Sequence, residues 1–227
     1  MTPASIRDRL LEHPALIVPV GTTEQHGPHL PLGCDTIIVE RLADDLSAAS
    51  GWMRAPTVEY GVHTPTRSFP GWAALRRKTL HGVMNELIES WEEGAGVRHF
   101  LILTAQNNDA HQEALSTIRA DEASVVAVDI FAMDFSTVIE RPGSPVQGGE
   151  LDTSLMLYVA PDLVHMELAQ DFALPTTGRS RFRPGHSREL PKGSPGSIGY
   201  PSLASAQKGE RVYSLIFERV SRCLTHC

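Results

Sequence analysis

Three side chains that bind divalent cations in many proteins stand close together near the start of the chain. Glu24, His26 and Asp35 lie within twelve residues of one another, in a stretch rich in Gly and Pro. Carboxylate oxygens and an imidazole nitrogen are donors that Zn2+ or Mn2+ accepts. Glu24 and His26 are two residues apart, so in an extended segment both side chains leave the same face. The spacing alone also fits a solvated turn, so these residues indicate a candidate metal site.

The segment before these residues predicts how they are positioned. Residues 16–20 form a short apolar run that is typical of a buried strand, and the Gly and Pro residues that follow mark a loop. The loop would leave the carboxyl end of the strand, which is where an open α/β sheet binds its ligands.

Composition limits the classes of protein to consider. The chain has 227 residues, of which 41% are apolar and 21% charged, and this predicts one globular domain over residues 1–227. A formal net charge of −7 disfavours nucleic-acid and anionic-membrane partners. The chain has no apolar run of the ~20 residues that span a membrane, and its first residues have no signal-peptide core. Three cysteines form no disulfide framework, so we expect a cytoplasmic protein with free thiols, two of them on a last helix.

Short apolar runs alternate with longer amphipathic runs along the chain. This alternation predicts an α/β fold, a single-domain three-layer α/β/α structure with a mainly parallel sheet. The expected strands are residues 16–20, 54–58, 100–103 and 124–131, and the expected helices are 2–13, 36–50, 79–93 and 109–120.

Four blocks in a fixed order resemble one known family. They are residues 17–36, with the sequence IVPVGTTEQHGPHLPLGCDT, then 69–80, 148–157 and 199–209. The chain is similar at these blocks to the creatininase (creatinine amidohydrolase) family. The blocks are spread over most of the chain, which makes the resemblance more specific than any one motif.

The resemblance implies a hydrolase of C–N bonds in cyclic or linear amides, with two divalent cations bridged by the loop aspartate. Glu24, His26 and Asp35 match metal ligands, with Asp35 as the bridge, and Glu150 matches a position that supplies a further carboxylate. The implied cation is Zn2+ or Mn2+, with Fe2+ a further option. The implied partners are a small-molecule substrate and other copies of the chain, often in a hexamer.

Two departures from the family pattern concern imidazoles. Gln106 stands where the family has a metal-binding histidine, and Gln147 replaces the histidine that opens the third block. A glutamine amide is a weaker ligand for Zn2+ and does not titrate near pH 7. We therefore predict one cation at most per subunit, held by His26, Asp35 and Glu150. Glu24 would either assist as a ligand or act as the base, and Gln106 and Gln147 are the other predicted catalytic positions.

Other residues are expected around the substrate. We predict contacts from His29, from Trp72 after the Phe-Pro-Gly turn, and from Asn107. His63, His111 and His186 are further imidazoles that could replace a lost one. Residues 175–201 form a long loop rich in Pro and Gly, with a basic run at 179–188, which suggests either a lid or a solvated connection.

Three hypotheses for function remain open at this stage. The first is a hydrolase with a reduced metal site. The second is a family member that catalyses a non-hydrolytic step such as ring or amide formation or an isomerisation, because one fold hosts many reactions. The third is a catalytically silent structural subunit.

Overall fold

A four-stranded parallel sheet forms the centre of the protein in a computed structural model, which describes residues 2–63, 69–141, 147–174 and 190–224. The strands are β1 (Ala15–Val20), β2 (Met53–Arg54), β3 (His99–Thr104) and β4 (Ser124–Asp129), in the order β2-β1-β3-β4. Every pairing is parallel, with Val20 opposite Thr104 and Thr104 opposite Asp129. The carboxyl ends of β1, β3 and β4 therefore meet at one edge of the sheet.

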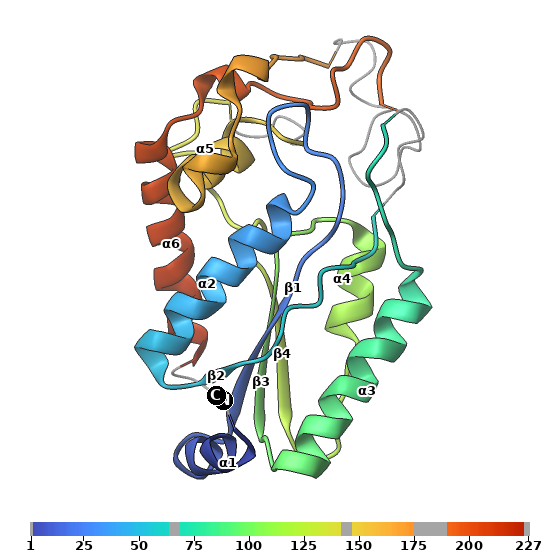
Figure 1. Ribbon diagram of the computed structural model, residues 1–227, viewed down its shortest axis with the longest axis vertical. Helices are drawn as coiled ribbons and strands as arrows, with labels where there is room; N and C mark the ends of the chain where they lie inside the picture. Colours follow the sequence, from blue (N-terminus) through green and yellow to red (C-terminus); the bar gives the residue numbers. More distant parts are fainter. Residues whose placement is uncertain (1, 64–68, 142–146, 175–189, 225–227) are drawn as a thin grey trace.

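Helices cover both faces of the sheet (Figure 1). One layer holds α2 (Cys34–Ser50), α5 (Glu150–Val159) and α6 (Ala206–Leu224), and the other holds α3 (Arg77–Ala95) and α4 (Asp109–Ser116). Helix α1 (Pro3–Glu12) lies at the amino-terminal end of the strands. Three short 3-10 turns, η1 (Pro161–Leu163), η2 (Met166–Leu168) and η3 (Pro201–Leu203), complete the described elements.

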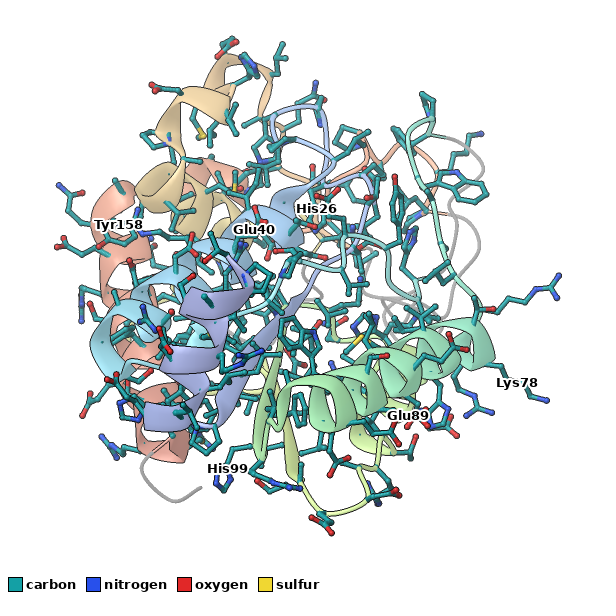
Figure 2. The ribbon with its side chains drawn as sticks, turned by 60° about the horizontal axis from the view of Figure 1, so that its bottom comes forward. His26, Glu40, Lys78, Glu89, His99 and Tyr158 are labelled. Atoms are coloured by element: carbon teal, nitrogen blue, oxygen red, sulfur yellow. The ribbon has the colours of Figure 1, made fainter. Side chains whose placement is uncertain are left out.

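Alternation along the strands divides the core in two. Ile17 and Leu101 pack in the cluster formed with α2, α5 and α6, whereas Leu16 and Phe100 pack in the cluster formed with α3 and α4. Neighbouring side chains of a strand point to opposite faces, so a strand that is apolar at every position requires a helical layer on each side. Figure 2 shows Lys78 and Glu89 on the outer side of α3 and Tyr158 on the opposite side of the molecule, near α6.

The observed fold confirms the predicted three-layer α/β/α class, with differences at particular elements. The strand expected at 54–58 is reduced to two residues, Met53 and Arg54, followed by a single bridge between Val58 and Val20. Helix α5 was not predicted. Seven consecutive residues from Glu150 to Met156 are buried and four of them are polar, so the sequence shows no apolar stripe with helical spacing. Cys223 lies on α6, as expected, and its thiol donates to the backbone carbonyl of Arg219, whereas Cys227 lies outside the described residues. No helix in the described part of the chain is long and apolar enough to cross a membrane.

Candidate metal centre

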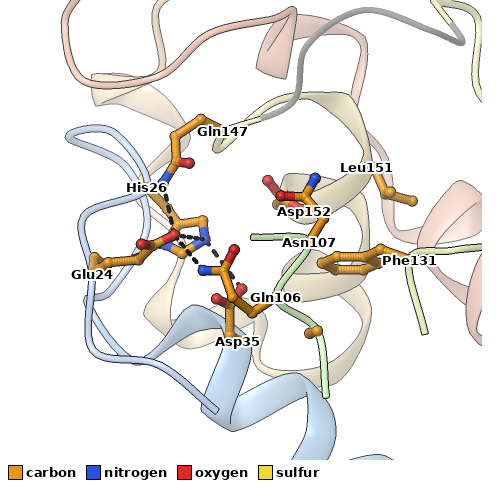
Figure 3. A pocket seen from close by; sticks show the side chains of 10 residues that line it. Glu24, His26, Asp35, Gln106, Asn107, Phe131, Gln147, Leu151 and Asp152 are labelled. Atoms are coloured by element: carbon orange, nitrogen blue, oxygen red, sulfur yellow. Dashed lines mark hydrogen bonds and ion pairs between the residues drawn. The ribbon is translucent and has the colours of Figure 1, made fainter. Parts of the chain in front are cut away.

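A small cavity of about 90 Å3 opens at the carboxyl ends of the strands (Figure 3). Its walls come from the loop after β1, the start of α2, the segment after β3, the segment after β4 and the start of α5. The lining residues are Glu24, His26, Asp35, Ala105, Gln106, Asn107, Phe131, Gln147, Leu151 and Asp152. The structure thus brings together the three predicted ligands of the first loop.

His26 and Asp35 form a close pair in this cavity. His26 Nε2 lies 3.2 Å from Asp35 Oδ1, and both side chains are almost fully buried. His26 Nδ1 donates to the backbone carbonyl of Glu24 at 3.2 Å, which leaves Nε2 as the nitrogen that faces Asp35. Asp35 also accepts a hydrogen bond from the Thr22 hydroxyl. Histidines that bind metals usually donate their second ring nitrogen in this way, so the geometry fits a cation ligand.

Close packing fixes the position of His26. Gly148 has a φ of +62°, and a Cβ at this residue would overlap the backbone oxygen of His26. A glycine is therefore required where the segment before α5 crosses the loop after β1.

Charges surround the imidazole of His26. Burial disfavours its charged form, but the carboxylates of Asp35, Glu24 and Asp152 outweigh burial and raise the pKa of His26 to about 10. The ring is therefore protonated at neutral pH when no cation is bound. A positive charge at this point stabilises the carboxylates, as a divalent cation would.

Glu24 accepts hydrogen bonds from three side chains. His63 Nδ1 lies 2.9 Å from Glu24 Oε2, and the Nε2 atoms of Gln106 and Gln147 lie 3.1 and 3.2 Å from Oε1. Burial alone would raise the pKa of Glu24. The hydrogen bond from His63 and the charges of His26 and His63 outweigh burial and lower that pKa to about 2. Glu24 is therefore ionised at every physiological pH.

Backbone contacts fix the orientation of both glutamine amides. Gln106 Oε1 accepts from the backbone N–H of Asn108 at 3.1 Å, and Gln147 Nε2 donates to the backbone carbonyl of Gln25 at 2.7 Å. A backbone N–H only donates and a carbonyl only accepts, so each amide must direct its NH2 group at Glu24. The two predicted catalytic glutamines therefore offer donors rather than lone pairs to this side of the cavity.

The structure does not bring Glu150 into the cavity, although the sequence suggested it as a ligand. Its carboxylate accepts from Lys208 Nζ at 2.6 Å and from the backbone N–H groups of Glu140 and Arg141. Asp152, two residues later, lines the cavity instead. Burial and the charge of Asp35, opposed by His26, raise the pKa of Asp152 to about 6.

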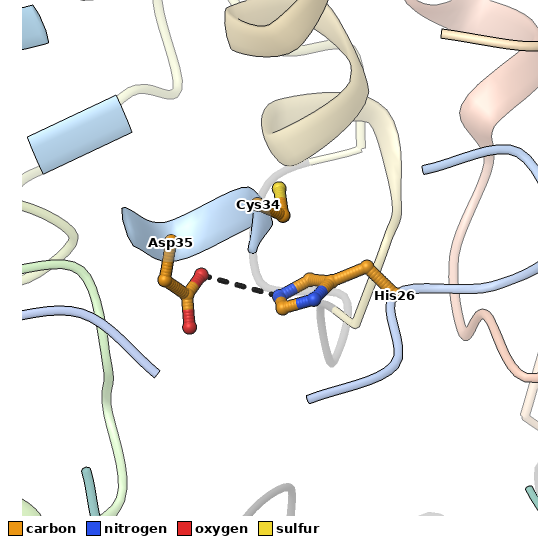
Figure 4. A group of neighbouring side chains, drawn as sticks. All are labelled: His26, Cys34 and Asp35. Atoms are coloured by element: carbon orange, nitrogen blue, oxygen red, sulfur yellow. Dashed lines mark ion pairs between the residues drawn. The ribbon is translucent and has the colours of Figure 1, made fainter. Parts of the chain in front are cut away.

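A further ligand type lies beside the His26 and Asp35 pair. Cys34 Sγ, one nitrogen of His26 and one carboxylate oxygen of Asp35 all lie within 4.8 Å of one another (Figure 4). Sequence reasoning did not include Cys34 among the candidate ligands because it counted the cysteines only as thiols without a disulfide partner. Its place directly before Asp35 was the available signal.

The predicted substrate-binding residues divide into two groups. Asn107 lines the cavity and is exposed, whereas His29 and Trp72 are not part of its lining. His29 is buried and its Nε2 lies 2.8 Å from the Thr153 hydroxyl, and the exposed Trp72 adjoins the bridge that joins Ala73 to the loop after β1.

The three other predicted histidines differ in where they lie relative to the cavity. His63 contacts Glu24, but His111 is buried beside Thr104 and the backbone of Val62. His186 and the basic run at 179–188 lie outside the described residues.

The chain is similar to known proteins over most of its length. A family model described as Creatininase, creatinine amidohydrolase, matches residues 1–224. A mycofactocin precursor peptide peptidase of Mycobacterium ulcerans is 27% identical over 224 residues, which cover 93% of this chain and 84% of that protein. A creatinine amidohydrolase of Pseudomonas putida is 23% identical and covers 91% of this chain and 86% of that protein.

A solved structure shares the fold. A mutant creatininase of the Zn-Zn type has a TM-score of 0.81, with 100% of this chain and 95% of that chain covered at 23% sequence identity. At this identity the likeness concerns the fold alone.

Proposed function

Because this chain belongs to the creatininase (creatinine amidohydrolase) family, we propose that it is a metal-dependent hydrolase that cleaves a C–N bond, in an amide or cyclic amide, of a small molecule. The observation that carries the proposal is the buried pair of His26 and Asp35, in which the second nitrogen of His26 is fixed by a backbone carbonyl. This arrangement is typical of a histidine that binds a metal, and both side chains line the cavity.

One divalent cation per chain fits these residues. His26, Asp35 and Asp152 would hold it, since three protein ligands and an open position are sufficient for a hydrolytic site. Zn2+ and Mn2+ are the cations we expect, with Fe2+ as a further option. When bound, the cation would polarise a carbonyl and acidify a water molecule.

A second cation is disfavoured on the Glu24 side of the cavity. Gln106 and Gln147 both direct amide N–H groups at Glu24, so a cation there would meet partial positive charges. To offer an oxygen, Gln106 would have to give up its hydrogen bond from the backbone of Asn108. The loss of a buried hydrogen bond costs about 1–3 kcal/mol.

Glu24 is the residue we assign to proton transfer. Its carboxylate is ionised and lies at the cavity wall, so it can accept a proton from the attacking water. A carboxylate with so low a pKa holds a proton only briefly. The proton must therefore pass to the leaving nitrogen within the same turnover, while the water oxygen bonds to the carbonyl carbon and the C–N bond breaks.

The two glutamines also keep the second hypothesis open. Neither can titrate near pH 7, so relative to the family pattern the site lacks one metal-binding imidazole and one imidazole that could move protons, and it retains groups that orient. A ring-forming or isomerising step would need orientation and exclusion of water more than a strong base. A structural subunit without activity would leave the buried charges of the cavity unexplained.

The experiment compares two acids of α5. We expect Asp152→Asn to lower the affinity for Zn2+ at least about a hundredfold, because even residues that only orient a ligand are worth about 10–100-fold. Glu150→Gln is the matched control and should retain the wild-type zinc content, since its carboxylate faces Lys208. Zinc per chain is measured by mass spectrometry after dialysis against a fixed free Zn2+ concentration.

Activity is then followed in both directions. Asp35→Asn should remain folded and lower turnover at least about a hundredfold on a panel of cyclic amides, their ring-opened acids and short peptide amides. Wild-type protein that binds zinc but transforms no member of the panel would favour the structural hypothesis. A homo-oligomer, a hexamer by family resemblance, and a cytoplasmic location stay predictions.

A further inference from the structure

Cys34 is the first residue of α2 and its side chain is completely buried. Its sulfur lies within 4.8 Å of a nitrogen of His26 and of a carboxylate oxygen of Asp35 (Figure 4). Sulfur, nitrogen and oxygen ligands of one tetrahedral zinc ion are about 3.5 Å apart, given bonds of about 2.3 Å to sulfur and about 2.0 Å to nitrogen. Side-chain movements of about 1 Å would bring the three atoms to that separation.

We propose that Cys34 provides a thiolate ligand to the cation held by His26 and Asp35, and that the site thereby selects Zn2+ over Mn2+. This inference rests on the proposed metal centre and adds one ligand to it. The family resemblance did not suggest it, because Cys34 matches none of the ligand positions implied by the four blocks. It follows from the packing of α2 against the loop that carries His26.

Three carboxylates, those of Asp152, Asp35 and Glu24, act on the charge of Cys34. A divalent cation would neutralise these carboxylates and replace the thiol proton. As the metal–sulfur bond forms, the S–H bond breaks and the proton leaves to solvent through the cavity.

The alternative is that Cys34 only fills space. Its side chain belongs to the apolar cluster that joins α2, α5 and the sheet, and a buried thiol often acts as a small apolar group. In that case the sulfur would stay protonated when a cation binds. The two roles therefore differ in a property that can be measured without any substrate.

A thiolate ligand also has a consequence for cation choice. Soft sulfur ligands favour Zn2+, Co2+ and Cd2+, whereas Mn2+ favours carboxylate, carbonyl and water oxygens. A site with His26 and carboxylates alone would discriminate less between zinc and manganese. Selection of Zn2+ by this chain should therefore depend on Cys34.

The test uses the metal-free full-length protein and Co2+ as the only probe. We expect visible d–d bands that report the bound ion, and a thiolate-to-cobalt charge-transfer band in the near ultraviolet that rises in parallel. In Cys34→Ser the charge-transfer band should disappear while the visible bands remain. Cys223→Ser, a change at a thiol on α6 that is not part of the cavity lining, is the matched control and should retain both. Competition between Zn2+ and Mn2+ should show a preference for zinc that falls at least about tenfold in Cys34→Ser.

Each result supports or overturns the proposal. Visible bands without a charge-transfer band in the wild type would show that Cys34 is not a ligand and would leave the metal centre intact. A charge-transfer band that persists in Cys34→Ser would assign the thiolate elsewhere and overturn the proposal. Absence of any cobalt binding would overturn both this proposal and the metal centre. Cys34→Ala provides a second variant if serine is not tolerated in the core, and the wild-type spectrum alone can refute the idea.

Discussion

Binding of a cation should displace a proton from His26. The carboxylates around the ring raise the pKa of His26 to about 10, so at pH 7.5 nearly every empty site carries a protonated imidazole. A metal ligand must be neutral, and the ring therefore loses one proton for each cation bound. The perturbation is the addition of Zn2+ to metal-free Cys34→Ser protein, in which His26 is the only proposed ligand that remains protonated at this pH.

The size of the effect follows from the difference between pH and pKa. A pH of 7.5 lies 2.5 units below the pKa of about 10, and at about 1.36 kcal/mol per unit the removal of the proton costs about 3.4 kcal/mol. The apparent affinity for Zn2+ should thus be about 160-fold weaker at pH 7.5 than at pH 10, where about half of the rings are still protonated. Between pH 6.5 and 9 it should rise about tenfold per pH unit.

Isothermal titration calorimetry in two buffers of different ionisation enthalpy gives the number of protons released. We expect about one at pH 7.5 in Cys34→Ser, and a second in the wild type if the thiol also binds. Zinc binding with no proton release in Cys34→Ser would refute the reasoning. It would mean either that His26 is neutral in the empty site or that the ring is not a ligand.

Three further predictions concern the surroundings of the site. The folded-state pKa of His26 is raised from 6.5 to about 10, so protonation of this ring should add up to about 5 kcal/mol to the free energy of unfolding of the metal-free protein. This stabilisation is fully present below pH 6.5 and is lost as the pH rises toward 10. Denaturant unfolding across this range checks it, and a flat profile contradicts it. His63→Leu should lower the free energy of unfolding by about 1–3 kcal/mol because the buried carboxylate it contacts loses a donor, whereas His63→Asn, which can still donate, should cost less. Equal losses in urea unfolding would show that only packing matters at this residue. Gln106→His together with Gln147→His should raise zinc content from one to two per chain, and an unchanged content would mean that the missing imidazoles do not limit the second cation.

Much of this protein could be read from its residues. The apolar runs at 16–20 and 100–103 predicted buried parallel strands, because strands covered on both faces are apolar at every position. The resemblance to the creatininase family rested on four sequence blocks in a fixed order, and the family match over residues 1–224 confirms it. The loop with Glu24, His26 and Asp35 was identified because its ligand types stand close together in sequence.

The tertiary structure alone decided which of the other side chains reach the cavity. Glu150 and Asp152 differ by two residues, and at 3.6 residues per turn their side chains leave α5 about 200° apart. Only the packing of α5 determines which of them faces His26 and which faces Lys208. The contact of His63 with Glu24 joins loops that are far apart in sequence, so no spacing could predict it. The sequence defines which metal-binding and hydrogen-bonding side chains the chain has. The rotation of each helix about its axis and the packing of each loop decide which of these side chains meet in the cavity.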